Sequence, residues 1–268
     1  HVRSRRQRQM CIRDSGRAVQ MLRQHAKQPL TIGYAPTSGI IYPASDRPED
    51  IEAARKKYFS MPEDDSNWTW NVAWWSDPVL LGKYPEEGLK KYEKYLPKIT
   101  EKDMRLISEP IDVYGQNIYN GRAFRMGADG NPEEVGRVPG AGKTAVNWPV
   151  TPECLYWGPK FLYERYKKPI YITENGMACH DVVSLDQRVH DPNRIDFLAR
   201  YLHELKRAAE EIDLRGYFQW SLMDNFEWEK GYAERFGIVY VDFETQERIL
   251  KDSAYWYRDV IQTNGRDL

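Results

Sequence analysis

Residues 169–176 read PIYITENG, and this stretch has the composition of a buried strand that ends at a carboxylate. β-Branched and aromatic residues fill the strand, and Asn175-Gly176 is a turn signal that closes it just after Glu174. Asp191-Pro192 then predicts a helix N-cap followed by proline at the first helical position. Residues 214–220 form the next expected strand. The helix between the two strands has an apolar face at spacings of three and four, made by Ile195, Leu198, Leu202, Leu205, Ala209 and Ile212.

The same alternation of strand and helix extends toward the N-terminus. Core strands are expected to begin near Leu30, Ile111, Pro169 and Leu214, with helices at 16–26, 47–59, 86–95, after Thr100, at 152–166 and at 253–262. Residues 121–149 contain many Gly, Asn and Pro breaks and are expected to be a long loop. This order predicts an α/β fold with a parallel sheet and crossover helices. A (β/α)8 barrel builds its active face from loops at strand carboxyl ends, but it needs eight strands and four are found.

Composition excludes several classes of function. The chain has 268 residues and a net charge of −1, so no nucleic acid or anionic membrane is expected as a partner. No apolar run approaches the roughly 20 residues that a membrane span needs. Three cysteines without regular spacing argue against a disulfide framework or a metal site, and predict a reduced, cytoplasmic protein.

The first fifteen residues differ from the rest of the chain, because they contain five arginines and almost no apolar periodicity. One interpretation is a basic arm for an anionic partner. The favoured interpretation is a non-native or disordered basic tail, because residues 6–14 resemble translated adapter or junction sequence. The expected division is therefore a tail at 1–15 and a domain at 16–268.

The candidate chemistry begins with Glu174, because a carboxylate at the last position of a buried strand points into the mouth of a barrel. The alternative is a glutamate that caps the next helix or pairs at the surface. A second signal favours the first interpretation. Residues 220–228 read WSLMDNFEW and residues 231–237 read GYAERFG, which makes a polar and aromatic loop after the last strand.

With these motifs in order and at matching spacing, the chain resembles glycoside hydrolase family 1, the β-glucosidase and β-galactosidase type. The resemblance runs from about residue 16 to residue 262 and includes the segment RFGIVYVD at 235–242. It implies a retaining β-glycosidase in which Glu174 is the nucleophile that attacks the anomeric carbon. It also implies that Tyr119 orients this nucleophile by a hydrogen bond, and that substrate contacts come from Asn117, Trp148, Trp220, Glu227, Trp228 and Phe236.

The chemistry suits these residue types. A carboxylate held close stabilises an oxocarbenium-like transition state and traps it as a glycosyl ester. Charge-assisted hydrogen bonds to Glu227 would hold sugar hydroxyls, while aromatic rings stack on the apolar face of the sugar. A carboxylate at that position would repel a phosphate on the sugar, so 6-phosphoglycosides are not expected as substrates. No cofactor is expected.

The second carboxyl of a retaining glycosidase is not found. In this family it lies in an Asn-Glu-Pro motif at the end of the fourth strand, and no such motif occurs in the chain. Glu109-Pro110 is preceded by Ser108 and lies before a strand rather than at the end of one. We therefore expect only the last four β/α units of the barrel, without the acid/base. A half-barrel has unpaired edges, so self-association through them is a further expectation.

Three interpretations follow for the chain as given. The first is a β-glucosidase-like hydrolase of β-linked glucosides, oligosaccharides or related β-glycosides. The second is a catalytically impaired half-barrel that binds carbohydrate. The third is an orphan fragment. The intact nucleophile strand favours the first for the gene, while the absent acid/base favours the others for the isolated chain.

Overall fold

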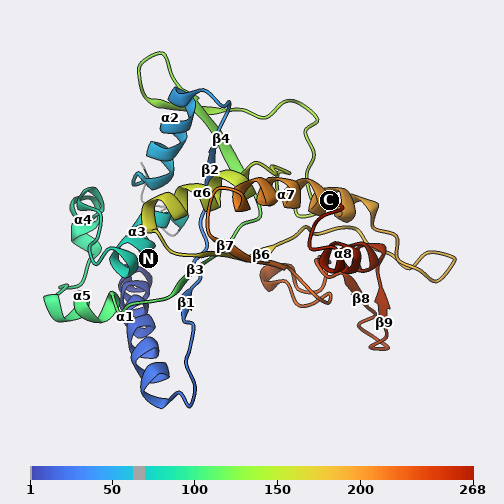
Figure 1. Ribbon diagram of the computed structural model, residues 1–268, viewed down its shortest axis with the longest axis horizontal. Coiled ribbons are helices and arrows are strands. Elements are labelled where there is room, and N and C mark those ends of the chain that lie inside the picture. Colours follow the sequence, from blue (N-terminus) through green and yellow to red (C-terminus); the bar gives the residue numbers. More distant parts are fainter. Residues whose placement is uncertain (1, 63–69) are drawn as a thin grey trace.

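The computed structural model describes residues 2–62 and 70–268, with side chains described from Ile12 onwards. A four-stranded parallel sheet lies at its centre, and its strands follow one another in chain order (Figure 1). They are β1 (Gly33–Tyr34), β3 (Val113–Asn117), β6 (Ile170–Asn175) and β7 (Leu214–Gln219). The predicted parallel sheet with four core strands is therefore confirmed, and all four strands point their carboxyl ends toward the same edge.

Helices precede, connect and follow the strands of this sheet. They are α1 (Val2–His25), α2 (Pro48–Phe59), α3 (Val72–Leu80), α4 (Glu86–Tyr92), α5 (Glu101–Ile107), α6 (Cys154–Tyr166), α7 (Pro192–Ala209) and α8 (Asp252–Gln262). The start of α5 is fixed by a reciprocal capping box. The backbone N–H of Asp103 donates to the Thr100 hydroxyl at 3.2 Å, and the N–H of Thr100 donates to the Asp103 carboxylate at 2.9 Å. The predicted N-cap at Thr100 is confirmed.

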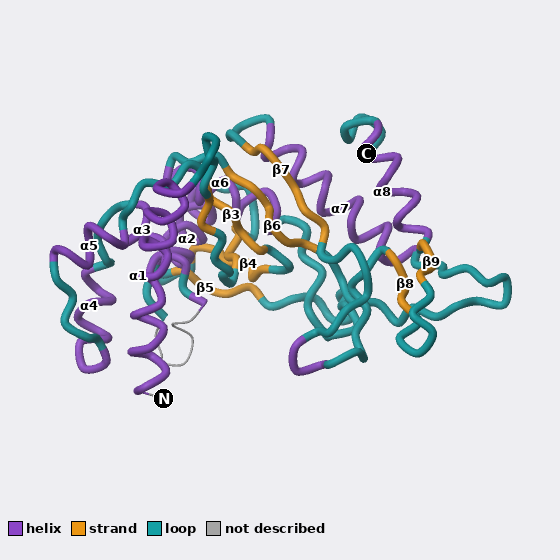
Figure 2. Tube along the Cα trace, turned by 90° about the horizontal axis from the view of Figure 1, so that it is seen from below, coloured by secondary structure: helices purple, strands orange, loops and turns teal. Residues whose placement is uncertain are grey.

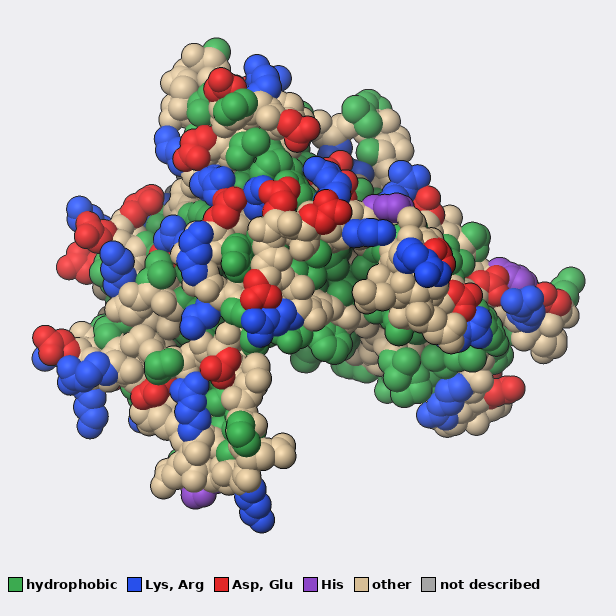
Figure 3. All heavy atoms as spheres, viewed as in Figure 1, with side chains coloured by type: hydrophobic (Ala, Val, Ile, Leu, Met, Phe, Trp, Pro, Cys, Tyr) green, Lys and Arg blue, Asp and Glu red, His purple; other side chains and the backbone are tan. Residues whose placement is uncertain are grey.

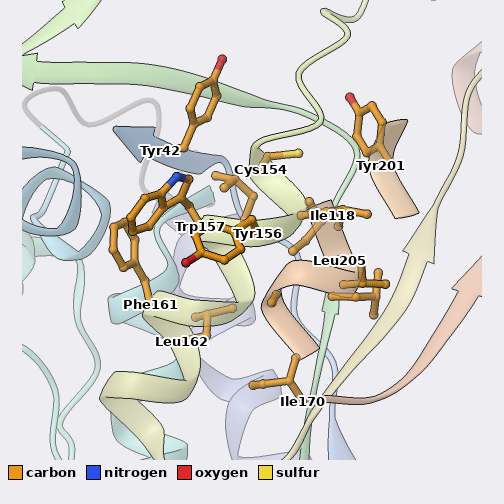
Figure 4. Close-up of a cluster of buried hydrophobic side chains, with 14 of the residues drawn as sticks. Tyr42, Ile118, Cys154, Tyr156, Trp157, Phe161, Leu162, Ile170, Tyr201 and Leu205 are labelled. Atoms are coloured by element: carbon orange, nitrogen blue, oxygen red, sulfur yellow. The ribbon is translucent and has the colours of Figure 1, made fainter. Parts of the chain in front are cut away.

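The main hydrophobic core lies between the sheet and the pair α6 and α7. Ile170 and Ile172 of β6 are fully buried in it. Figure 4 shows Leu162 of α6 and Leu205 of α7 on either side of Ile170. Figure 2 shows the strands (orange) gathered in the middle of the molecule, with α8 and the short hairpin of β8 (Val239–Val241) and β9 (Arg248–Leu250) at one end. The two helices thus cover one face of the sheet.

The prediction of one long loop at 121–149 was wrong in its first part. This segment contains β4 (Gly121–Met126) and β5 (Pro132–Val135), which pair as an antiparallel hairpin, and β2 (Ile40–Pro43) pairs with β4 to complete a second sheet. Asp129-Gly130 makes the turn. The Asp129 carboxylate accepts a hydrogen bond from the N–H of Asn131 at 3.0 Å, and Gly130 takes a positive φ of 77°.

Other element boundaries also differ from the predictions. The first strand begins later than the predicted start near Leu30, because Leu30 is exposed and pairing begins only at Gly33. On α7, Ala209 is exposed and Ala208 is buried in its place. Helix α3 was not predicted. It begins where the Asn71 side chain accepts a hydrogen bond from the N–H of Trp74 at 2.7 Å.

The first helix begins at Val2 rather than at residue 16. Ile12 is buried against Ile107 of α5, and Gly16 approaches the backbone of Leu106 so closely that a Cβ there would lie 1.8 Å from its carbonyl oxygen. Residue 1 and the side chains before Ile12 lie outside the described part, so the non-native or disordered tail at 1–15 and the domain at 16–268 stay predictions. Along the described ranges, no helix combines the length and the apolar character that a bilayer crossing requires.

Candidate active site

Glu174 lies at the carboxyl end of β6, where its strand meets β3. The register shifts between Gln116 and Asn117, which leaves Asn117 opposite Glu174. The hydroxyl of Tyr119, just past the end of β3, donates a hydrogen bond to Oε2 of Glu174 at 2.6 Å. The Thr173 hydroxyl donates to the Asn117 side-chain oxygen at 2.6 Å. The structure therefore brings the predicted nucleophile and its predicted orienting tyrosine into direct contact, while the Asn117 oxygen is engaged by a neighbouring strand.

Burial and the neighbouring carboxylates keep the Tyr119 hydroxyl protonated, so it acts as a hydrogen-bond donor. Burial, followed by the hydrogen bond to Glu174 and the charges of Glu174 and Glu227, raises the pKa of Tyr119 far above its ordinary value. Because the phenol stays protonated, it can hold Oε2 without competing for a proton. The backbone carbonyl of Tyr119 in turn accepts a hydrogen bond from the hydroxyl of Tyr201 at 3.1 Å, which anchors this loop on α7.

Three aromatic rings form one wall of the site. Tyr119 contacts Trp148 with ring centroids 5.2 Å apart, and Phe236 lies 6.2 Å from Tyr119 and 5.9 Å from Trp148. Phe236 is buried, whereas Trp148 is partly open to solvent. Aromatic pairs at these separations and tilted angles stabilise each other beyond simple burial. The wall therefore combines a fixed inner ring with an outer ring that is free to contact a ligand.

Glu227 lies in the loop after β7 and faces the same site. Burial, then the charges of Glu174 and Glu234, raise the pKa of Glu227, although an interaction with the Trp220 side chain opposes the rise. Its Oε2 atom is buried and has no hydrogen-bond partner among the described residues. A buried acceptor without a partner costs about 1–3 kcal/mol, and a ligand hydroxyl would remove that cost. Trp228, the next residue, is 80% exposed.

Asn175 links the carboxyl ends of β3, β6 and β7. From the sequence it was interpreted only as a turn signal. Its side-chain amide donates to the carbonyl of Ile118 at 2.8 Å and accepts from the Tyr217 hydroxyl at 2.8 Å. Its backbone carbonyl accepts from the N–H of Trp220 at 2.7 Å. This fully buried asparagine therefore fixes Glu174 relative to both neighbouring loops. The available signal was its position directly after a strand-end glutamate.

A buried ion network supports the loop that carries Glu227, and it was missed from sequence. Lys251 lies at its centre and donates to Asp181 at 2.6 Å and to Asp224 at 2.8 Å. Arg194 of α7 pairs with Asp181 at 2.7 Å, and Arg235 pairs with Asp224 at 2.6 Å. Lys251 and Arg194 are completely buried. The members are far apart in the chain, so only the folded structure brings them together.

The network also explains how α7 starts. Asp191 lies at the predicted N-cap position, but its side chain makes no cap hydrogen bond. It instead pairs with Arg194 and accepts hydrogen bonds from the N–H and hydroxyl of Ser253, at 2.8 and 2.5 Å. Burial opposes ionisation of Asp181, but Arg194 and Lys251 outweigh it and hold the pKa of Asp181 below its ordinary value. The charges are therefore mutually compensated.

The site combines a carboxylate held by tyrosine at the carboxyl end of a strand, a second carboxylate and a wall of aromatic rings. This combination of groups is typical of enzymes that act on sugars. A family model described as "Glycosyl hydrolase family 1" matches residues 4–266. The chain belongs to glycosyl hydrolase family 1.

Individual relatives agree with this assignment. The chain is 43% identical over 258 residues to "Beta-glucosidase A" of Thermotoga maritima, covering 95% of this chain and 55% of that protein. It is 40% identical to "Beta-glucosidase A" of Acetivibrio thermocellus, covering 93% of this chain and 55% of that protein. The solved structure "Beta-glucosidase from Thermotoga maritima in complex with deoxynojirimycin" superimposes with a TM-score of 0.78 at 43% identity, covering 95% of this chain and 56% of that chain.

The chain spans about half the length of the relatives that it matches, and this is the C-terminal half that the resemblance predicted. The fold is correspondingly part of a barrel, with four parallel strands in the described residues.

Proposed function

We propose that this chain forms the nucleophile and sugar-binding half of a retaining β-glycosidase that hydrolyses β-linked glucosides or related β-glycosides. The proposal rests above all on the 2.6 Å hydrogen bond between the Tyr119 hydroxyl and Oε2 of Glu174 at the carboxyl end of the sheet. Family membership supports the reaction class.

In the first step, a carboxylate oxygen of Glu174 forms a bond to the anomeric carbon while the bond from that carbon to the leaving oxygen breaks. The leaving oxygen takes up a proton and departs as an alcohol. Tyr119 holds Oε2, which leaves Oε1 to attack. A fixed carboxylate needs little reorganisation as positive charge develops on the sugar ring, and this lowers the barrier.

In the second step, water attacks the anomeric carbon of the glycosyl ester. The bond to Glu174 breaks, the hydroxyl stays on the sugar, and one proton passes to a base. Two displacements at the same carbon restore the original configuration, so the product retains the β-anomer. Glu174 returns to its ionised state and is ready for another substrate.

Glu227, Trp220 and Trp228 would bind the glycone, the sugar whose linkage is cleaved. The unpartnered Oε2 of Glu227 is an acceptor for a sugar hydroxyl. The Trp220 side chain interacts with the same carboxylate. Trp228 presents an open aromatic face, while Trp148 borders the site on the side where a leaving group would lie.

We further propose that the acid/base carboxyl comes from outside these 268 residues. A retaining enzyme holds its two carboxyls about 5–5.5 Å apart. Glu227 interacts with the Trp220 side chain and would bind the glycone rather than transfer a proton. Without a general acid, turnover should fall by about 10²–10⁴ for substrates with poor leaving groups.

The free thiols of Cys154 and Cys179 support a cytoplasmic setting.

The names of relatives support the substrate class. They include "Beta-glucosidase A", "1,4-beta-D-glucan glucohydrolase" and "Bifunctional beta-D-glucosidase/beta-D-fucosidase". One matched Thermotoga maritima structure is described as a complex with a galacto-hydroximolactam.

Covalent trapping tests the proposed nucleophile. A dinitrophenyl 2-deoxy-2-fluoro-β-glucoside needs no general acid, because its leaving group is already a stable anion. We expect one sugar adduct per chain, mapped to Glu174 by peptide mass spectrometry. Glu174→Gln should abolish the adduct, and Glu164→Gln on α6 is the matched control. A folded chain that gains no adduct, or gains it at another residue, contradicts the proposal.

A second candidate function is carbohydrate binding without turnover. The observation that favours it is Trp228, whose 80% exposed ring lies next to the buried acceptor of Glu227. Quenching of tryptophan fluorescence by cellobiose, lost in Trp228→Ala, combined with no covalent adduct, would favour this function over hydrolysis.

A further inference from the structure

Tyr201 of α7 holds its hydroxyl against the backbone of the candidate active site. The residue is fully buried, and its ring stacks on Phe197, one turn earlier, with centroids 3.9 Å apart. Figure 4 shows the hydroxyl directed away from Ile170, the first residue of β6. The opposite face of α7 is solvated, because Arg200 and Asp196 form an exposed ion pair there. Figure 3 shows charged side chains of both signs over the region of α6 and α7. Packing on the core side therefore fixes the Tyr201 ring.

The Tyr201 hydroxyl joins two backbone segments. It donates a hydrogen bond to the carbonyl oxygen of Tyr119 at 3.1 Å and accepts one from the N–H of Thr151 at 2.8 Å. Burial raises the pKa of Tyr201 above its ordinary value, so the hydroxyl keeps the proton that it donates. The Thr151 hydroxyl oxygen in turn accepts from the N–H of Gly121 at 2.9 Å. We call these three hydrogen bonds the Tyr201 clamp.

The two segments in the clamp carry two rings of the aromatic wall. Tyr119 lies on the segment after β3, and Trp148 lies three residues before Thr151 on the segment that leads into α6. The two rings are in contact, with centroids 5.2 Å apart. The backbone of Trp148 is held as well, because its N–H donates to the Thr144 hydroxyl at 3.2 Å and its carbonyl accepts from the Thr144 N–H at 2.9 Å. One buried hydroxyl therefore sets the spacing between the backbones of both rings.

The clamp reaches Glu174 through Tyr119. The Tyr201 hydroxyl bonds to backbone atoms, whereas the Tyr119 hydroxyl bonds directly to Oε2 of Glu174 at 2.6 Å. Hydrogen bonds weaken steeply as their angle departs from linear, so a small movement of the Tyr119 backbone would loosen this contact. The stacking of Tyr201 inside α7 is thereby transmitted to the orientation of the carboxylate.

We propose that Tyr201 and Thr151 are positioning residues, which act by holding Tyr119 in the place where its hydroxyl orients Glu174. This inference rests on the proposed function. The clamp lies on the side of β3 and α7, whereas Glu227 lies in the loop after β7. Breaking the clamp should therefore slow the covalent step on Glu174 and leave the affinity for the glycone unchanged.

Trapping kinetics test the positioning role. Inactivation by the dinitrophenyl 2-deoxy-2-fluoro-β-glucoside gives a rate constant for the covalent step and a dissociation constant for the reagent. Tyr201→Phe keeps the ring stack but removes the hydroxyl. We expect it to lower the rate constant by about 10-fold, because small misplacements of a reacting group are costly, and to leave the dissociation constant unchanged. An unchanged rate constant would overturn the proposal.

Tyr166→Phe is the matched control. Tyr166 is also buried, and its hydroxyl donates to the Asp77 carboxylate at 2.8 Å, at the end of α6 that precedes β6. The same substitution there removes an equivalent buried hydrogen bond without touching the clamp. We expect both constants to match those of the parent. An equal slowing in Tyr166→Phe and Tyr201→Phe would assign the effect to lost stability and overturn the proposal.

A double variant separates positioning of Tyr119 from other effects. In Tyr119→Phe no hydroxyl remains to be positioned, so adding Tyr201→Phe should slow the covalent step no further. Slowing by the full factor in the double variant would show that Tyr201 acts by another route. Thr151→Val cuts the clamp from its other side and should follow the same pattern. It decides the question if circular dichroism shows that Tyr201→Phe does not fold.

Nuclear magnetic resonance supplies a measurement that needs no reaction. With tyrosine labelled at Cζ, the Tyr119 signal is the one absent from Tyr119→Phe. We expect this signal in Tyr201→Phe to move toward its position in Glu174→Ala, where the acceptor is gone, and to stay in place in Tyr166→Phe. A signal that is unmoved in both Tyr201→Phe and Thr151→Val overturns the proposal. If the parent forms no adduct on Glu174, the proposed function fails, and the Tyr119 signal alone decides whether the clamp positions its hydroxyl.

Discussion

The Tyr119 hydroxyl donates a 2.6 Å hydrogen bond to Oε2 of Glu174, across the junction of β3 and β6. Hydrogen bonds to an ionised acceptor are short and roughly twice as strong as neutral ones, so this contact fixes the carboxylate in both position and rotation. The backbone on each side is also tied, since the N–H of Ile118 donates to the carbonyl of Glu174 at 2.9 Å. The pair therefore behaves as one rigid unit.

Removing the tyrosine hydroxyl should slow covalent trapping without unfolding the chain. Tyr119→Phe keeps the ring contacts with Trp148 and Phe236 but leaves Oε2 unheld. We expect the rate of adduct formation on Glu174 to fall by roughly 10²-fold, the size typical of losing one preorganised donor. Tyr255→Phe on α8, where the ring is exposed, should have no effect. An unchanged trapping rate in Tyr119→Phe would remove its orienting role.

Glu227→Gln should weaken sugar binding. The substitution keeps the shape of the side chain but removes the charge, and hydrogen bonds to charged acceptors contribute about 1.5–3 kcal/mol. We therefore expect the affinity for deoxynojirimycin, measured by calorimetry at neutral pH, to fall by at least 10-fold. Glu229→Gln, two residues away and exposed, serves as the control. Equal affinities in the two variants would contradict glycone binding by Glu227.

The same substitution should stabilise the fold at neutral pH. Burial and the charges of Glu174 and Glu234 raise the pKa of Glu227, so the folded state binds more protons than the unfolded state between the two pKa values. Stability from this group is present below its ordinary pKa and is lost as pH rises through the raised value. We expect the Tm of Glu227→Gln to exceed that of the parent at pH 7 and to match it near pH 4.

Lys251→Met should destabilise the chain strongly. Lys251 is completely buried between Asp181 and Asp224, and removing one partner of a buried ion pair costs roughly 3–5 kcal/mol. Denaturant unfolding should show this loss, while Lys102→Met on the exposed side of α5 should change the free energy of unfolding by less than about 0.5 kcal/mol. A small effect at Lys251 would mean that Arg194 and Arg235 compensate both carboxylates alone.

Gly176→Ala should displace the end of β6. A Cβ at this position would lie 1.9 Å from the Trp220 carbonyl oxygen, which is backbone and cannot rotate away. Overpacking of this kind costs about 1–3 kcal/mol or more, and the shift would move Glu174 relative to Tyr119. We expect a lower Tm together with slower trapping. Gly136→Ala, where a Cβ would meet nothing within 4 Å, should match the parent in both measurements.

The sequence predicted the four core strands because each is a run of β-branched and aromatic residues followed by turn residues, as in residues 169–176. The hydrogen bond between Tyr119 and Glu174 was also predicted, but from the family resemblance and not from geometry. The hairpin of β4 and β5 was missed because its strands are rich in charged residues and lack a clear alternation. Asp129-Gly130 was the available turn signal.

The buried ion network could not be predicted in the same way. Asp181, Asp191 and Asp224 look like ordinary loop or cap residues in sequence, and Lys251 looks like a surface lysine. Their burial depends on contacts between segments that are up to 70 residues apart. Long-range electrostatic partners have no local periodicity, so neither propensity nor spacing identifies them. The unpartnered Oε2 of Glu227 is hidden from sequence for the same reason.

The ions buried around Lys251 also determine where this polypeptide can be divided. A protease cut or a gene split between residues 225 and 250 would separate Lys251 from the two loop aspartates that it neutralises, and rejoining the pieces would require dehydrating free charges. The segment from β6 to α8 is therefore a single indivisible block for circular permutation or split-protein engineering. The exposed turn at Asp129-Gly130, remote from those charges, is the natural place for an inserted reporter domain.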